Sequence, residues 1–92
     1  MTYFTIEQIR NANKALGRHW FDASTLRFFS SRIAGPVISN MFVSSERLDA
    51  NLPRLYTIRR ANEDGSIDTV GEFQQYTSKR AALAAIRQMS KN

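Results

Sequence analysis

The residue types that could carry out nucleophilic catalysis gather in one short segment, HWFDAS, at residues 19–24. A serine, a histidine and a carboxylate can form a triad in which the histidine removes the serine proton. His19, Asp22 and Ser24 are near neighbours, but no nucleophile elbow or oxyanion signature accompanies them. We therefore interpret His19 as a partly exposed loop residue beside a packing tryptophan. We assign no catalytic residue and predict that the protein is not an enzyme.

Metal and cofactor ligands are scarce. The chain has no cysteine and one histidine, so a zinc site lacks ligands. The acids of NEDGSID, at residues 62–68, lack the alternating ligand pattern of a calcium loop, and Asn, Asp and Gly are what a tight turn requires. The four glycines are scattered and form no phosphate-binding loop. We predict no metal, no cofactor and no small-molecule substrate.

Basic residues are the chain's most numerous charged residues. Thirteen Lys and Arg residues face eight Asp and Glu residues, which gives a net charge of +5. This balance favours a polyanionic partner such as nucleic acid or a ribonucleoprotein. Residues 1–35 and 78–92 are basic, whereas residues 36–77 are slightly acidic. If the two ends pack together, they form one basic surface. We predict a contact surface made of Arg10, Lys14, Arg18, Arg59, Lys79, Arg80 and Arg87.

Arg59 and its neighbour Arg60 lie in the predicted strand RLYTIRR. Adjacent strand residues point to opposite faces, so these two arginines cannot form one clamp. Arg59 is predicted on the open face of a sheet. There it either pairs with a carboxylate of the facing strand, Asp68 or Glu63, or binds a phosphate or carboxylate bidentately.

Two helices are expected near the ends of the chain. The segment TIEQ, at residues 5–8, has the form of a capping box, and apolar residues then recur at helical spacing. This pattern predicts a helix over residues 6–16. The segment KRAALAAIRQM predicts a second helix over residues 79–89, with Thr77 or Ser78 as its cap.

Between the helices lie segments that favour β-structure. The predicted strands are residues 28–33, 41–46, 54–60 and 67–76. Gly35-Pro36 ends the first of them, and a β-bulge is expected near Gly71 in the last. Residues 37–40 either extend a strand or belong to a connection. The order predicts one α+β domain over residues 1–92: an antiparallel β-meander of three to four strands, with the N-terminal and C-terminal helices packed on one face.

Ten aromatic residues could in principle stack on nucleic-acid bases. A domain this small needs most of its large side chains for the core, so we expect the strand aromatics, Phe73 among them, to be buried. Tyr3, Trp20 and Tyr76 lie near element ends and are the better candidates for exposure.

Three segments carry a family resemblance: FFSSRI at residues 28–33, MFVSSE at residues 41–46, and RLYTIRRANEDGSIDTVGEFQQYTSKRAALAAI at residues 54–86. They share an F-x-S-R element, an F-V-[ST]-S-E element and a Y-T-[IV]-R hairpin with small proteins of phages and mobile elements. Over about residues 26–87 the chain resembles the type I-F anti-CRISPR proteins, in particular the eighth family of that group. Its motifs are structural and mark no contact residues.

The resemblance implies a non-enzymatic inhibitor in the cytoplasm of an infected bacterial host. Such a protein binds the Cas protein–guide RNA surveillance complex, with direct guide-RNA contact, and blocks target-DNA hybridisation or access. The alternative is a small basic DNA- or RNA-binding accessory protein of a mobile element. No apolar segment approaches the roughly 20 residues that span a bilayer, so no membrane partner is expected.

Overall fold

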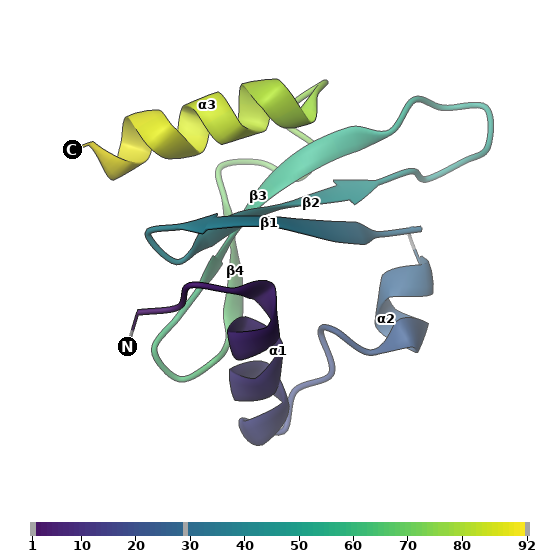
Figure 1. Ribbon diagram of the computed structural model, residues 1–92. Helices are drawn as coiled ribbons and strands as arrows, with labels where there is room; N and C mark the ends of the chain where they lie inside the picture. Colours follow the sequence, from purple (N-terminus) through teal and green to yellow (C-terminus); the bar gives the residue numbers. More distant parts are fainter. Residues whose placement is uncertain (1, 29, 92) are drawn as a thin grey trace.

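The computed structural model describes residues 2–28 and 30–91. Its elements are α1 (Ile6–Ala15), α2 (Ala23–Phe28), β1 (Arg32–Ile38), β2 (Met41–Glu46), β3 (Leu55–Ala61), β4 (Ile67–Val70) and α3 (Lys79–Ser90). The strands form one antiparallel sheet in the order β1-β2-β3-β4 (Figure 1). The predicted α+β class and its meander are confirmed, and both terminal helices pack on the sheet.

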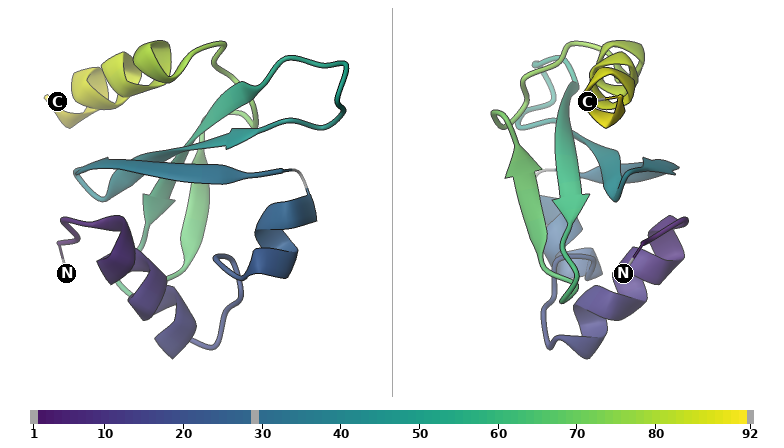
Figure 2. Two further views of the ribbon diagram at one scale, coloured as in Figure 1. Left: turned by 45° about the vertical axis from the view of Figure 1, so that its right-hand side comes forward. Right: turned by 90° about the vertical axis from the view of Figure 1, so that its left-hand side faces the viewer.

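The two terminal helices cover opposite faces of the sheet, so their predicted placement on one face is wrong (Figures 1 and 2). The reason lies in β2, which is buried along its whole length. Met41 and Val43 point to one face and pack with Ala82 and Ile86 of α3. Phe42 points to the other face and packs in the cluster that contains Ile9, Tyr3 and Ala61. Because each face carries large apolar side chains, each needs its own helix.

The helix starts follow the local sequence. The Thr5 hydroxyl accepts the Gln8 N–H at 3.2 Å, and the Gln8 side chain accepts the Thr5 N–H at 3.2 Å. The predicted capping box is therefore present. At α3 the Ser78 hydroxyl accepts the Ala81 N–H at 3.1 Å, which decides between the two predicted caps.

The segment before the first hairpin differs from the prediction. Residues 23–28 form α2, and β1 begins at Arg32 and runs through Gly35-Pro36. Phe29, in the predicted strand, lies outside the described residues. The register of β1 against β2 shifts between Ala34 and Ile38. Proline is tolerated because β1 is an edge strand, where its missing N–H need not break the ladder.

The connection between β1 and β2 is a tight hairpin. Val37 and Ile38 belong to β1, whereas Ser39 and Asn40 form the turn with φ of 51° and 63°. Two consecutive positive φ values are typical of the turns that match the twist of a hairpin. Residues 37–40 are thus divided between the two roles that the sequence left open.

The last strand is shorter than predicted. β4 ends at Val70, and Gly71, with φ of +79°, turns the chain instead of forming a bulge. The chain returns at Tyr76, whose backbone exchanges two hydrogen bonds with Tyr56, at 2.8 and 3.0 Å. Residues 71–75, which connect these two points, are not part of the strand. This segment contains Phe73.

Candidate functional site

The predicted basic surface is divided between two faces of the sheet. Arg10, Lys14 and Arg18 come together around one hollow of about 320 Å³ beside α1, which Asp22 also lines. Lys79, Arg80 and Arg87 lie on α3, which covers the opposite face. The prediction that the two ends of the chain form a single surface is therefore wrong, for the same reason that the helices are separated.

Arg59 lies on the predicted sheet face, but that face is covered rather than open. Its side chain is only 13% exposed. Nε donates to the Ser44 hydroxyl at 3.0 Å, and Nη1 donates to the Thr69 hydroxyl. Nη2 lies 3.9 Å from Oε1 of Glu46, which is 1% exposed. Because these donors are engaged within the protein, Arg59 is not the exposed anion receptor that the sequence suggested.

Asp68, one of the two carboxylates predicted to pair with Arg59, does not take that role. Asp68 faces Arg60 in the register of β3 and β4, and its carboxylate accepts a hydrogen bond from the Asn62 side chain at 2.9 Å. The partner is instead Glu46 on β2, on the same covered face. The alternation of residues along the strand predicted the sheet face on which Arg59 lies. It could not predict which strand supplies the carboxylate, because that depends on the order of the strands in the sheet.

Glu46 lies at the centre of a buried polar network. The Thr57 hydroxyl donates to its Oε1 at 2.7 Å, and the Gln74 side chain donates to its backbone carbonyl at 3.0 Å. Its Oε2 is buried and has no hydrogen-bond partner within residues 2–28 and 30–91. Burial lowers the pKa of Arg59, and the charge of Glu46 acts in the opposite direction. Arginine nevertheless stays cationic in proteins, so the network contains an ion pair.

A second concentration of charge was missed by the sequence analysis. A groove of about 670 Å³ lies between α2, the start of β1 and the loop from β2 to β3. Its basic residues, here called the arginine groove, are Arg27, Arg32, Arg47 and Arg54. Asp49 is the one carboxylate that lines it. Four guanidinium groups around one hollow make a region of positive potential.

Two of these arginines also build the groove. Arg54 Nη1 donates to the backbone carbonyls of Ser30, at 2.8 Å, and Ser45, at 3.1 Å, and so joins the β2–β3 loop to the segment before β1. Arg47 donates to the carbonyls of Leu52, at 3.0 Å, and Ala50, and so closes its own loop.

The other two arginines, Arg27 and Arg32, are exposed, as Arg47 is. Arg27 is in the last turn of α2, and Arg32 is the first residue of β1. Within the described part of the chain, none of the four groove arginines forms a salt bridge. Their charge is therefore available to an external anion.

The arginine groove could have been predicted from the order of the strands, although not from the charge of each sequence segment. In an antiparallel meander, the start of β1, the end of β2 and the start of β3 meet at one end of the sheet. Arg32 opposes Ser45, which in turn opposes Tyr56, so the arginines that flank these strands converge. Counting charge by sequence segment placed Arg47 and Arg54 in an acidic middle and separated them from Arg27 and Arg32.

Lys79, one of the predicted contact residues, lies next to the arginine groove. It lines a smaller hollow of about 220 Å³ together with Arg32, Arg54 and Tyr56. The positive charge therefore continues from the arginine groove toward the start of α3.

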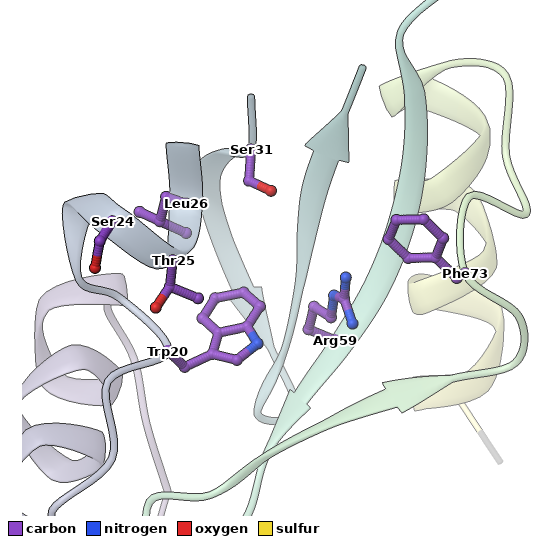
Figure 3. Close-up of a pocket in the computed structure, with 7 residues that line it drawn as sticks. All are labelled: Trp20, Ser24, Thr25, Leu26, Ser31, Arg59 and Phe73. Carbon is purple, nitrogen blue, oxygen red and sulfur yellow. The ribbon is translucent and has the colours of Figure 1, made fainter. Parts of the chain in front are cut away.

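A fourth hollow adjoins the arginine groove and shares Leu26 and Ser31 with it. This hollow, here called the aromatic pocket, has a volume of about 520 Å³. Figure 3 shows Arg59 between Trp20 on one side and Phe73 on the other. Phe73 is 42% exposed and not a core residue, because the turn at Gly71 carries it out of the predicted strand.

Tyr3 and Tyr76, the two tyrosines that were predicted to be exposed, do not line the aromatic pocket. Tyr3 is 2% exposed, and its hydroxyl donates to the backbone carbonyl of Asn62 at 2.9 Å, so the prediction of exposure is wrong there. Tyr76 is half-buried and packs against the cluster on the α3 side. Trp20 is half-buried, and one side of its ring faces the pocket (Figure 3).

A sequence profile of the family of unknown function DUF7447 matches residues 5–87. The chain belongs to this family. The match runs from the capping threonine of α1 to the last turns of α3, so it includes the whole sheet and the arginine groove. No curated protein and no solved structure matches the chain. Because the DUF7447 family has no assigned function, the chemistry has to be argued from the site.

The candidate catalytic and metal-ligating side chains were compared with the geometry that each chemistry needs, over the part of the chain that the structure describes. His19 Nδ1 lies 3.0 Å from the Asp22 carboxylate, and both side chains are exposed. Ser24 lines the aromatic pocket, and the contact of His19 is with Asp22. Across residues 2–28 and 30–91, no three His, Cys, Asp or Glu side chains gather to hold a metal ion, and no helix has the length and apolar character to cross a membrane.

Proposed function

We propose that the protein is a non-enzymatic binding protein whose arginine groove holds the sugar–phosphate backbone of a nucleic acid. The observation that carries this proposal is the gathering of four arginines around one groove with a single carboxylate. A guanidinium group presents parallel N–H donors that match two phosphate oxygens, so arginine is well suited to this contact. Arg27 and Arg32, which are exposed, are the natural phosphate ligands.

The extent of the positive charge favours a polymer over a single anion. One phosphate is satisfied by one or two guanidinium groups, whereas the arginine groove holds four and Lys79 extends the charge beyond them. A chain of phosphates can use the whole series and release its bound counterions, which strengthens binding at low salt.

The identity of the polymer divides into two candidates. The resemblance to type I-F anti-CRISPR proteins favours the guide RNA of a Cas surveillance complex in the cytoplasm of a bacterial host. Binding there would block target-DNA hybridisation or access. The second candidate is free DNA or RNA, bound as by an accessory protein of a mobile element. The arginine groove supports both, because it would recognise a phosphate backbone in either setting.

Binding to a fluorescently labelled oligonucleotide, followed by anisotropy over a range of salt concentrations, tests the proposal. The variant Arg27→Glu/Arg32→Glu should bind at least about tenfold more weakly than the wild type, because two phosphate contacts become repulsive. The dependence of log K on log salt should also become less steep by about 2. Neither arginine has a structural salt bridge, so the melting temperature should stay close to the wild-type value.

The matched control is Arg80→Glu/Arg87→Glu, which makes the same change of charge on α3. This control should lose much less affinity than the groove variant. Equal losses in both variants would mean that only net charge matters, and the arginine groove would have no special role. Pull-down with a type I-F Cas–guide RNA complex, using the same two variants, separates the two candidate partners.

A further inference from the structure

The aromatic pocket is an unassigned cavity beside the arginine groove. It lies on the covered face of the sheet, between α2 and the segment after β4 (Figure 3). Leu26 and Ser31 line both hollows, so the aromatic pocket and the arginine groove are neighbours at these two residues.

Flat surfaces meet at the base of this pocket. The guanidinium carbon of Arg59 lies 5.5 Å from the ring centroid of Trp20 and 5.5 Å from that of Phe73. Its bonds to Ser44 and Thr69 fix the orientation of the guanidinium plane. Indole, phenyl and guanidinium planes are the surfaces on which proteins stack unpaired bases.

The walls of the pocket are held in place by the fold. The backbone N–H of Trp20 donates to the Asn13 side chain at 3.2 Å, and buried Asn13 donates in turn to the Gly65 carbonyl at 2.9 Å. The Trp20 ring packs edge-on against Phe21, with centroids 4.7 Å apart. A preformed site of this kind needs little ordering when a ligand binds.

The opposite wall is also fixed, and the rim is polar. Gln74, next to Phe73, donates its backbone N–H to the Thr57 hydroxyl at 2.8 Å. Ser24, Thr25 and Ser31 line the pocket, and hydroxyl groups can both donate to and accept from the edge of a base. An anionic group fits the pocket less well, because Glu46 and two hydroxyls already engage Arg59.

We propose that the aromatic pocket accepts one unpaired nucleobase while the adjoining phosphates lie in the arginine groove. This inference rests on the proposed function and narrows its ligand to single-stranded nucleic acid. Bases of a duplex are paired and stacked inside the helix, so they cannot enter the pocket without melting. The protein therefore binds single strands more tightly than duplexes of the same sequence.

Trp20 is the only tryptophan of the chain, so its fluorescence reports on the aromatic pocket directly. The probes are a thymidine oligonucleotide, a duplex of the same length, and an abasic oligonucleotide with the same phosphate backbone. Anisotropy measures binding of each probe, and Trp20 fluorescence measures entry of a base. We expect the thymidine oligonucleotide to quench Trp20 and to bind about tenfold more tightly than the abasic one.

The variant Phe73→Ala removes one stacking wall at a position that is already 42% exposed. It should bind the thymidine oligonucleotide about fivefold more weakly and leave abasic binding unchanged. The matched control is Phe4→Ala, whose side chain is 72% exposed and does not line the aromatic pocket. This control should bind all three probes as the wild type does.

The outcomes separate the two proposals. Equal affinity for all three probes with no quenching of Trp20 would overturn the base pocket and leave the phosphate-binding groove standing. Binding to none of the probes would overturn the base pocket and free nucleic acid as the ligand of the arginine groove. Loss of thymidine binding in Phe73→Ala with an unchanged circular dichroism spectrum would support the base pocket.

Discussion

Replacing Arg59 with methionine should destabilise the protein strongly, and replacing Glu46 with glutamine in the same chain should restore part of the loss. Methionine keeps an apolar stem of similar length and removes the charge. The Glu46 carboxylate, which is 1% exposed, would then lose the cation that is paired with it. A buried charge left without its partner is one of the few changes that destabilise a small domain severely.

The magnitude follows from the geometry of the pair. Two unit charges 3.9 Å apart attract each other by about 4 kcal/mol at an effective dielectric constant of about 20. The methionine also removes the hydrogen bonds to Ser44 and Thr69, each worth about 1 kcal/mol. Because Arg59 is released from a partly desolvated position, these terms are partly offset, and we expect a net loss of about 3–5 kcal/mol.

Glu46→Gln alone should have a small effect, about 1 kcal/mol. Glutamine keeps an oxygen that accepts the Thr57 hydroxyl, and the removal of a buried charge offsets the attraction to Arg59 that is lost. In the double variant no buried carboxylate remains to be left unpaired. The double variant should therefore be more stable than the sum of the single losses predicts, by about 2 kcal/mol.

Urea unfolding followed by far-ultraviolet circular dichroism measures all three variants and avoids Trp20, whose fluorescence depends on Arg59. The matched control is Arg60→Met, one residue along the same strand and exposed, which should change the free energy of unfolding by less than about 0.5 kcal/mol. Additive losses in the double variant would refute the reasoning. They would show that Arg59 stabilises the fold through Ser44, Thr69 and the two rings and not through Glu46.

Two further predictions concern the turn between β3 and β4. Gly65→Ala should destabilise the protein by about 3 kcal/mol in thermal or urea unfolding, because φ is +96° and a Cβ would lie 2.4 Å from the backbone oxygen of Ala12. The control is Gly17→Ala, where φ is +87° and the added carbon meets open space, so only backbone strain lowers the stability, by about 1 kcal/mol. Equal losses in the two variants would show that the clash with Ala12 does not matter. Hydrogen bonds from the Ser66 hydroxyl and N–H lower the pKa of Asp64 below its ordinary 3.8, so this contribution to stability is complete above about pH 4 and is lost as the pH falls through the lowered value. Melting temperatures between pH 2.5 and 7 should fall less steeply for Asp64→Asn than for the wild type, and parallel curves would show that the bonds do not matter.

Local patterns predicted the elements that local forces decide. The capping box at Thr5 and the cap at Ser78 appear in the structure because the bonds involve residues three apart. The alternation along β3 predicted that Arg59 and Arg60 point to opposite faces, and Tyr56 and Ile58 lie on the face opposite to that of Arg59. The period of a strand fixes such faces without knowledge of its neighbours.

The side on which a helix packs required information from β2. Met41, Phe42 and Val43 are all large, and their alternation already implied that both faces need cover. The aromatic pocket was harder to predict. In a continuous strand Phe73 would lie on the same face as Ile67, six residues earlier, and this pattern predicts a core residue. Only the turn at Gly71, which a strand pattern does not reveal, carries it to the surface.

Neither free border of the sheet offers a good template for another chain. On one side β1 contains Gly35-Pro36, and its register shifts there. On the other side β4 is only four residues long before the backbone turns away. Exposed strands of this kind recruit neighbours poorly. Copies of the protein at high concentration can therefore remain separate molecules and avoid joining into fibrils.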